Sequence, residues 1–366
     1  MKPRIKSQRV DYFFVALIFL LVAFGLAMLA SASSVLGKVK FNDSYFYLKH
    51  QIIYGLLIGL LGFFVAVNVY YRRWEKMALI FLLISLLLLI LVFSPLGFMS
   101  GSARRWISIG SVTFQPSEII KLTFLVYLAA WLSKNRERSR SFFRGFLPFL
   151  FLVAFIAGLL VAQNSASAAL IFLTTAILVY FISGAKFRYI LAIVFLGLLS
   201  LPLIIYVAPY RWERIITFLN PQADPLGYGY QINQTILAIG SGKLWGRGYG
   251  QSIAKIHYLP EQIGDSIFAV IAEELGFGGV AGLIAAFFLL IWRSFIIANR
   301  TSDGFAKLLV VGFSLTIGLQ VFVHIAALTG IIPLTGVPLP FISYGGTALA
   351  VFLTMAGIIV NISKYE

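Results

Sequence analysis

The chain has 366 residues, of which 60% are hydrophobic and only 11% are charged, and its formal net charge is +16. Soluble globular domains carry roughly 25% charged residues, so this composition excludes an ordinary soluble protein and indicates a membrane protein. The absence of cysteine excludes disulfides, a thiol nucleophile and a thiolate metal site. The basic excess suits anionic lipid headgroups or a phosphorylated substrate, whereas no soluble basic module that would favour nucleic acid is present.

Apolar runs recur along the whole chain, and each is long enough to cross a hydrocarbon core of about 30 Å. The first run ends in "ASASS", as a cleavable signal peptide would, but its length is nearer that of a retained span. We therefore expect an all-α polytopic membrane protein with a single domain, 1–366. About ten transmembrane helices are predicted, near 11–31, 50–69, 77–96, 115–133, 146–162, 167–184, 188–209, 266–292, 305–330 and 346–362.

Basic residues predict the orientation, because short cytoplasmic loops are enriched in lysine and arginine. A cytoplasmic N-terminus places most of the basic residues on that side, including the run from Lys134 to Arg144. An even number of spans then puts both termini in the cytoplasm. The long connection between the seventh and eighth spans, about 210–264, faces outward, and its clustered turn signals favour an ordered functional loop.

Acidic residues are scarce, yet four of the 13 lie in "LPEQIGDSIFAVIAEELG" at the start of the eighth span. Asp265 lies where the outer loop meets this span. It caps the helix or lies against the positive end of the helix dipole, or it acts as a partly desolvated carboxylate that accepts a proton from a hydroxyl, and these roles can coexist. On a straight helix Glu273 and Glu274 would lie roughly 12 to 14 Å deeper, too far to share a substrate atom with Asp265. A functional role and hydrogen bonding between helices both remain open for them.

The fourth span opens with "TFQPSEIIKL", in which Glu118 suits the first turn of a helix. Lys121 lies three residues further along, close enough for an intrahelical ion pair with Glu118. Arg104 and Arg105, in "GSARRWISIG", stand on the same outer side. They bind lipid headgroups or, with Lys121, form a set of cations suited to a diphosphate. The three histidines are far apart in sequence, so no residue is assigned as a metal ligand.

These motifs, in this order, resemble the SEDS family of bacterial cell-wall proteins (RodA, FtsW and SpoVE). The resemblance covers nearly the whole chain. The stretch "GQSIAKIHYLPE" is more similar to the division branch, FtsW, than to the elongation branch, RodA. The other matching segments are "ARRWISIG", "QPSEIIKL", "GYGYQINQTILAIGSGKLWGRGYG", "DSIFAVIAEELGFGG" and "GVPLPFISYGGTA".

The resemblance implies a peptidoglycan glycosyltransferase that polymerises lipid II at the outer face of the bacterial cytoplasmic membrane, in cell division or cell-shape maintenance. It also implies a class B penicillin-binding protein as partner. Asp265 matches the essential aspartate of the family. The predicted catalytic residues are Asp265, Glu118 and Lys121, and the predicted substrate-binding residues are Arg104, Arg105, Arg211, Arg214, Lys243 and Ser343.

Two features depart from the family pattern. The family usually has Thr-Asp-Phe around the aspartate, where this chain has Gly264 and Ser266 on either side, and a second family acid is absent from "AQNSASAAL". As a hypothesis, Asp265 is the general base for the acceptor 4-hydroxyl. The cations would stabilise the departing pyrophosphate, alone or with a divalent cation such as Mg²⁺ or Mn²⁺, and Glu118 would orient Lys121 or help hold that metal.

Two other functions suit the same set of helices. A transporter that flips the lipid-linked sugar predicts an inverted repeat, and the sequence shows none. A non-catalytic scaffold for division proteins predicts that Asp265→Ala leaves function intact.

Overall fold

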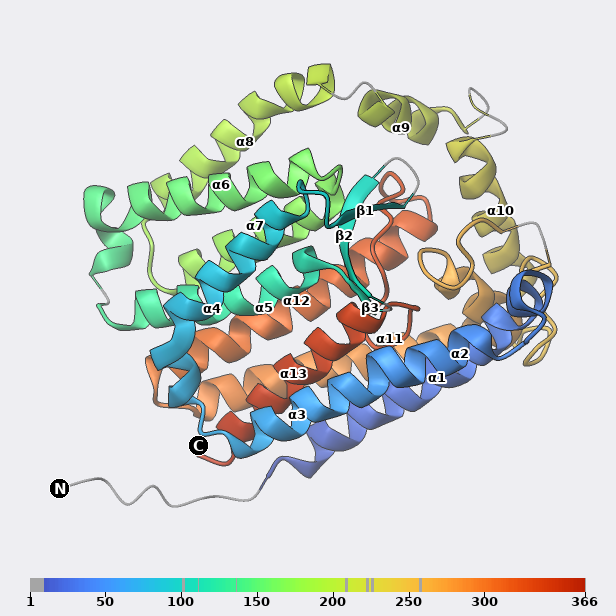
Figure 1. The fold of residues 1–366 in the computed structure, drawn as a ribbon, viewed down its shortest axis with the longest axis horizontal. Helices are drawn as coiled ribbons and strands as arrows, with labels where there is room; N and C mark the ends of the chain where they lie inside the picture. Colours follow the sequence, from blue (N-terminus) through green and yellow to red (C-terminus); the bar gives the residue numbers. More distant parts are fainter. Residues whose placement is uncertain are drawn as a thin grey trace.

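The computed structural model describes residues 10–100, 103–110, 112–135, 137–207, 210–221, 224, 227–256 and 259–365. Most of them are helical (Figure 1). Three short segments, η1 (Gln51–Leu57, π-helical), η2 (Arg138–Arg140) and η3 (Phe142–Phe146), join longer helices. The α-helices are α1 (Tyr12–Phe41), α2 (Phe46–His50), α3 (Ile58–Asn68), α4 (Arg72–Leu91), α5 (Pro116–Ser133), α6 (Leu147–Ala162), α7 (Ala166–Ile182), α8 (Phe187–Val207), α9 (Tyr210–Leu219), α10 (Tyr228–Ser241), α11 (Ile267–Arg300), α12 (Gly304–Leu328) and α13 (Gly346–Ser363).

Within the described ranges, seven helical stretches are long and apolar enough to cross a membrane. Two shorter apolar helices, Ala166–Ile182 and Phe187–Ser200, add to them. Every apolar run in the sequence coincides with one helix or with two joined segments, so the chain is a multi-pass membrane protein. The predicted runs are shorter than α1 and α11. Hydropathy marks only the apolar part of a helix, and both helices extend beyond that part.

The helices form one bundle around α12 and α13 (Figure 1). Helix α12 packs against α5, α7 and α11, while α13 packs against α3 and η1. Large side chains such as Phe305, Phe313 and Phe352 are buried at these contacts. Both helices therefore present buried faces on most sides, and the residues that shape the site are attached to a rigid centre.

The beginning of α1 and the end of α13 meet at one end of the bundle. The amide of Asp11 donates to Ser363 Oγ at 3.3 Å, and Arg293 Nε lies 2.7 Å from Asp11 Oδ2. Arg72 pairs with Asp303 nearby, across 3.2 Å. The opposite end of the bundle carries a small sheet and the segment around Asp265 (Figure 1).

The all-helical prediction is wrong between α4 and α5. Three strands, β1 (Gly97–Ser100), β2 (Ala103–Ile109) and β3 (Val112–Phe114), form an antiparallel sheet in the order β1-β2-β3. The register pairs Phe98 with Trp106 and Ile107 with Phe114. Aromatic and β-branched residues favour strands, but these strands are short, and a hydropathy window suited to spans passes over them.

The connection predicted as a loop over 210–264 contains two helices, α9 and α10, followed by a turn-rich segment that packs on α11. Helix α11 is kinked at Gly276, whose φ of 65° and ψ of −167° are not helical. A Cβ at Gly276 would lie 2.2 Å from the amide nitrogen of Gly246 and 2.7 Å from the carbonyl oxygen of Leu244. Only glycine permits both this conformation and this close approach.

Candidate functional site

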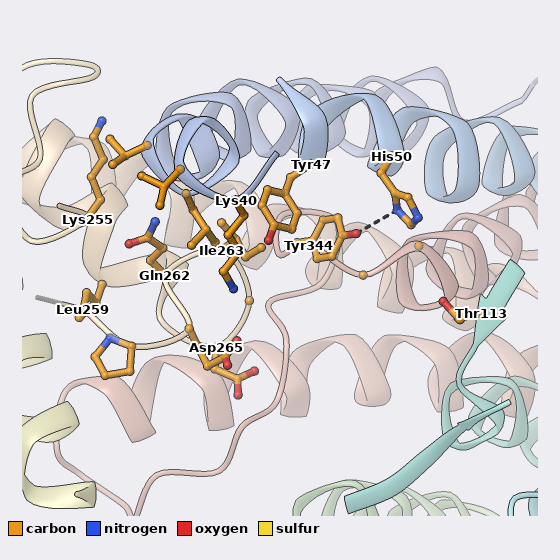
Figure 2. Close-up of a pocket in the computed structure, with 18 of the residues that line it drawn as sticks. Lys40, Tyr47, His50, Thr113, Lys255, Leu259, Gln262, Ile263, Asp265 and Tyr344 are labelled. Atoms are coloured by element: carbon orange, nitrogen blue, oxygen red, sulfur yellow. Dashed lines mark hydrogen bonds between the residues drawn. The ribbon is translucent and has the colours of Figure 1, made fainter. Parts of the chain in front are cut away.

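A cavity of about 780 Å³ opens at the end of the bundle that carries the sheet (Figure 2). Its volume falls in the range of roughly 300–1,000 Å³ that is common for ligand pockets. Its walls come from the last part of α1, from α2 and η1, from the sheet, from the segment before α11 and from the turn before α13. Segments from both ends of the sequence thus converge on one cavity.

Asp265 lines this cavity, and Figure 2 shows its side chain projecting from the segment that precedes α11. It also lines a second cavity of about 50 Å³, together with Arg214, Gln231 and His324. The N-cap of α11 is Ser266, and no side chain caps this helix. Asp265 is therefore not the N-cap itself, although it lies next to the positive end of the helix dipole, and this partly exposed residue lines the cavity.

The surroundings of Asp265 make its carboxylate more basic than usual. Its pKa is raised to about 6: burial raises it most, the nearby carboxylate of Glu261 raises it as well, and Arg105 and Arg214 lower it. A pKa near the working pH lets a carboxylate be ionised and still be basic enough to accept a proton. The carboxylate can therefore serve as a general base at neutral pH.

The structure separates the predicted basic pair. Arg105, on β2, donates a hydrogen bond to the carbonyl of Asn164 and is near enough to Asp265 to affect its ionisation. Arg104 points elsewhere and donates through Nη1 to the carbonyl of Phe93 at 3.2 Å. Arg105 and Arg214, rather than the two adjacent arginines, supply the positive charge beside Asp265.

Lys121 and Glu118 form the expected ion pair, but both are buried. Lys121 Nζ lies 2.8 Å from each carboxylate oxygen of Glu118 and donates to Gln320 Oε1 at 2.8 Å. Neither residue is among the described residues that line the Asp265 cavity. The predicted convergence of Lys121 with Arg104 and Arg105 is thus not observed, although a catalytic role for the pair stays a prediction.

The buried ion pair of Lys121 and Glu118 is connected to Asp265 through Gln320 and a short backbone segment. Gln320, which accepts from Lys121, donates through Nε2 to the carbonyl of Pro338 at 2.9 Å. Two residues earlier, Gly336 has a φ of +61°, and a Cβ there would lie 3.0 Å from Asp265 Oδ2. The ion pair therefore supports the segment that packs against the Asp265 carboxylate.

Ser343 fixes the segment before Asp265 from the other side. Its buried hydroxyl donates to the carbonyl of Gly264 at 2.7 Å and accepts from the amide of Leu339 at 2.8 Å. The next residue, Tyr344, donates its amide to the carbonyl of Ile263 at 2.9 Å. Since the hydroxyl is engaged with the backbone, this geometry gives Ser343 a positioning role, and substrate contact stays a prediction.

The two remaining residues predicted to bind substrate are Arg211 and Lys243. Arg211 belongs to α9, and its side chain lies outside the described part of the structure. Lys243 is exposed in the turn after α10, where its carbonyl accepts from the amide of Phe277 at 2.8 Å. Lys243 is not among the described residues that line the Asp265 cavity, so its contact with substrate also stays a prediction.

Glu273 holds the turn-rich segment against α11. Its carboxylate accepts from the hydroxyl of Ser252 at 2.6 Å and from the amides of Ile253 and Ala254 at 3.1 Å each. Arg247 Nε lies 3.3 Å away. The kink at Gly276 follows Glu273, so Glu273 lies on the short helical segment between Asp265 and the longer part of α11.

Glu274 faces a different set of partners, as the helical rotation predicts. The hydroxyl of Ser31 on α1 donates to Glu274 Oε1 at 2.6 Å, and Lys255 Nζ donates to the same oxygen at 2.8 Å. Lys255 also donates to the carbonyl of Gly250 at 2.8 Å. The bond from Ser31 confirms hydrogen bonding between helices, and both acids fasten the segment that leads to Asp265.

Several cavity residues were not singled out from the sequence. Lys40 ends up in the cavity because α1 continues past its apolar run. Tyr47, His50 and Tyr54 are spaced by three and four residues, a helical period that marks one face and was available in the sequence. Tyr344, from the turn before α13, joins them from a distant part of the chain.

The donor set does not form a dedicated metal centre. Within the residues that the structure describes, no group of three or more histidine, aspartate or glutamate side chains could hold a metal ion. Glu261 and Asp265 both line the cavity, and one or two carboxylates are what a Mg²⁺ ion takes from a protein when substrate phosphates supply other ligands. Glu118 is engaged with Lys121 instead.

The architecture defines a multi-pass membrane protein with a cavity at one end of its helix bundle, and ionisable side chains line that cavity. The model of the FtsW, RodA and SpoVE family of cell cycle proteins matches residues 11–366. The chain therefore belongs to this family.

Two relatives are similar to this chain over almost its whole length. The probable peptidoglycan glycosyltransferase FtsW of Geobacter sp. (strain M18) is 40% identical over 348 residues, covering 94% of each chain. Stage V sporulation protein E of Bacillus subtilis (strain 168) is 38% identical over 362 residues, covering 99% of each.

Among solved structures, a chain described under "Structural coordination of polymerization and crosslinking by a peptidoglycan synthase complex" matches with a TM-score of 0.80. It is 31% identical, and the match covers 97% of each chain. The rod shape determining protein RodA of Thermus thermophilus matches with a TM-score of 0.72 and 29% identity over 98% of each chain. The similarity extends over almost the whole length in each case.

Proposed function

We infer that this protein is a peptidoglycan glycosyltransferase that polymerises lipid II into glycan strands, in cell division or cell-shape maintenance. Family membership over residues 11–366 and the names of the relatives support the reaction class. The observation that carries the chemistry is Asp265, a partly exposed carboxylate with a raised pKa that faces a cavity of about 780 Å³. A scaffold would not require such a group.

The reaction joins an acceptor sugar hydroxyl to the anomeric carbon of a donor whose leaving group is a polyprenyl pyrophosphate. We propose that Asp265 removes the proton of the acceptor 4-hydroxyl as the new glycosidic bond forms. The bond from the anomeric carbon to the pyrophosphate oxygen breaks on the opposite face, so the configuration inverts. General base catalysis of this kind is typically worth about 10²–10⁴-fold in rate.

The leaving group carries the charge that develops as its bond breaks. Arg105 and Arg214 are close enough to Asp265 to lower its pKa, and Lys40 lines the larger cavity that Asp265 also lines, so we assign these three cations to the pyrophosphate. Arginine offers paired donors to phosphate oxygens, and preorganised positive charge stabilises the transition state. A divalent cation bound with the pyrophosphate would neutralise further charge, and Glu261 would be its protein ligand.

The proposed reaction takes place at the outer face of the membrane, and this determines how we place the chain in it. We propose ten spans in the bacterial cytoplasmic membrane, with α5, α7 and α8 completing the seven long apolar stretches and with both termini in the cytoplasm. The cavity and the sheet then face outward. A class B penicillin-binding protein is the proposed partner, supported by the similarity to a chain of a peptidoglycan synthase complex.

The test is polymerisation by purified protein. Wild type and Asp265→Asn are supplied with lipid II and the partner transpeptidase, and glycan polymer is separated by length on a gel. We expect polymer from wild type and at least about a 100-fold loss in the variant. Polymer that is unchanged in the variant would remove Asp265 from its role. Absence of polymer from both, with lipid II crossing vesicle membranes, would favour a transporter.

A further inference from the structure

One wall of the Asp265 cavity is lined by aromatic rings. Tyr47 and His50 come from α2, Tyr54 comes from η1, and Tyr344 comes from the turn before α13. We call these four side chains the aromatic wall. Figure 2 shows Tyr47, Tyr344 and His50 beside one another, with Asp265 on the other side of the pocket.

The aromatic wall is held in a fixed geometry. The rings of Tyr47 and Tyr344 are 5.4 Å apart at 89°, and those of His50 and Tyr54 are 4.5 Å apart at 41°. A hydrogen bond of 2.9 Å joins the Tyr344 hydroxyl to His50 Nδ1. The π-helical turn at Gln51–Leu57 is of a kind found frequently at functional sites. The rings are therefore preorganised and partly exposed to the cavity.

The wall is connected to the segment that carries Asp265. Gln51 Oε1 accepts from the amide of Gly345 at 3.0 Å, which ties η1 to the turn before α13. The same turn is bonded to the backbone of Ile263 and Gly264, through the Tyr344 amide and the Ser343 hydroxyl. The separation between the ring faces and the Asp265 carboxylate is thus set by hydrogen bonds, not by a flexible loop.

The chemistry of this wall matches a sugar ring. Tyrosine and histidine rings present an apolar face and a polar edge, and a pyranose has an apolar C–H face with hydroxyl groups around its rim. The carboxylate of Asp265 lies in the same cavity and suits a sugar hydroxyl. A hydrocarbon chain needs no such group. The aliphatic side chains Val35 and Leu36 of α1, which also line the cavity, suit such a chain better.

We propose that the aromatic wall is a saccharide subsite that stacks on an N-acetylhexosamine ring of the acceptor glycan and presents its 4-hydroxyl to Asp265. The assignment rests on the proposed function for the identity of the sugar. The wall itself stands on the ring geometry and on the hydrogen bonds to the Asp265 segment. Tyr47 and Tyr344 contact the sugar in this arrangement, and Gln51 acts as a positioning residue.

The experiment measures sugar binding separately from polymerisation. Purified protein in nanodiscs is titrated with a soluble β-1,4-linked trimer of N-acetylglucosamine, and binding is followed by saturation-transfer NMR. Tyr47→Ala and Tyr344→Ala are compared with Tyr47→Phe, which keeps the ring. Tyr45→Ala is the matched control, because Tyr45 is exposed in the same region and is not among the described residues that line the cavity.

We expect Tyr47→Ala and Tyr344→Ala each to weaken trimer binding about ten-fold, while Tyr47→Phe and Tyr45→Ala bind like wild type. In the polymer assay Tyr47→Ala should raise KM for lipid II more than it lowers kcat. Thermal unfolding identifies any variant that has lost its fold, and Tyr47→Ala then decides the question if Tyr344→Ala is unfolded.

Two results would overturn the subsite. One is trimer binding that is equal in wild type, Tyr47→Ala and Tyr344→Ala. The other is no trimer binding by wild type together with binding of a short polyprenyl phosphate that Tyr47→Ala abolishes, which would make the wall a lipid site. Trimer binding that depends on the wall, without polymer from wild type, would keep the subsite and reject the proposed function.

Discussion

The carboxylates of Asp265 and Glu274 lie nine positions apart in sequence and have opposite surroundings. Glu274 is buried, and Ser31 and Lys255 satisfy it with short hydrogen bonds. Asp265 is partly exposed in a cavity, near two arginines and another carboxylate, with a pKa raised to about 6. Acids that hold a fold are saturated with partners, whereas an acid that does chemistry keeps an open side. The comparison predicts different consequences for removing each one.

The largest effect on stability should follow the loss of Glu274. Glu274→Ala leaves the buried ammonium group of Lys255 without its carboxylate, and breaking a buried pair in this way costs about 3–5 kcal/mol. Thermal unfolding in detergent measures the change. Glu75→Ala is the control, since Glu75 faces the half-exposed Arg72 across 3.7 Å and should lose less than about 1 kcal/mol. Equal losses in the two variants would show that Glu274 does not anchor the fold.

A smaller effect is expected where Gly336 packs against Asp265. Gly336→Ala would place a Cβ 3.0 Å from Asp265 Oδ2 and strain a residue whose φ is +61°, which together should cost about 1–3 kcal/mol. Polymerisation should fall about ten-fold, because a displaced base loses its alignment with the acceptor. Gly282→Ala is the control: a Cβ there meets nothing within 4 Å, so activity should be unchanged. Normal polymerisation by Gly336→Ala would argue against this support of Asp265.

The smallest effect concerns the pH dependence of polymerisation. Asp265 must be ionised to accept a proton, so kcat/KM should fall as pH drops below about 6. Glu261 raises the pKa of Asp265, and Glu261→Gln should therefore move the acid limb of the profile to lower pH. Steady-state rates between pH 5 and 8 measure both. An acid limb that stays in place in Glu261→Gln would mean that another group controls the profile.

Hydropathy predicted the spans well because the membrane imposes one simple rule on each helix. It failed where other constraints decide, as in the short sheet that contains Trp106. It also did not show the kink at Gly276, where the close approach of Gly246 and Leu244 accompanies a break in the helix. Such contacts join segments far apart in sequence.

The candidate site was predicted in part. Asp265 stands out because acids are rare in an apolar chain, and its cavity was expected from its position. Lys121 was expected to face that cavity, but Glu118 and Gln320 satisfy it inside the bundle, and spacing alone does not show a partner on another helix. The aromatic wall requires Tyr344 to meet Tyr47 across almost 300 residues, and one sequence cannot show that meeting.

The stability of Asp265→Asn as a function of pH tests the contrast most directly. A raised pKa means that the folded state disfavours the ionised carboxylate. Wild type should therefore lose stability relative to the variant as pH rises from about 4 to about 6. Above pH 7 the variant should be more stable by an amount on the order of 1–3 kcal/mol, while it makes no polymer. An Asp265→Asn protein that is less stable than wild type above pH 7 would contradict the account, because Asp265 would then support the fold as Glu274 does.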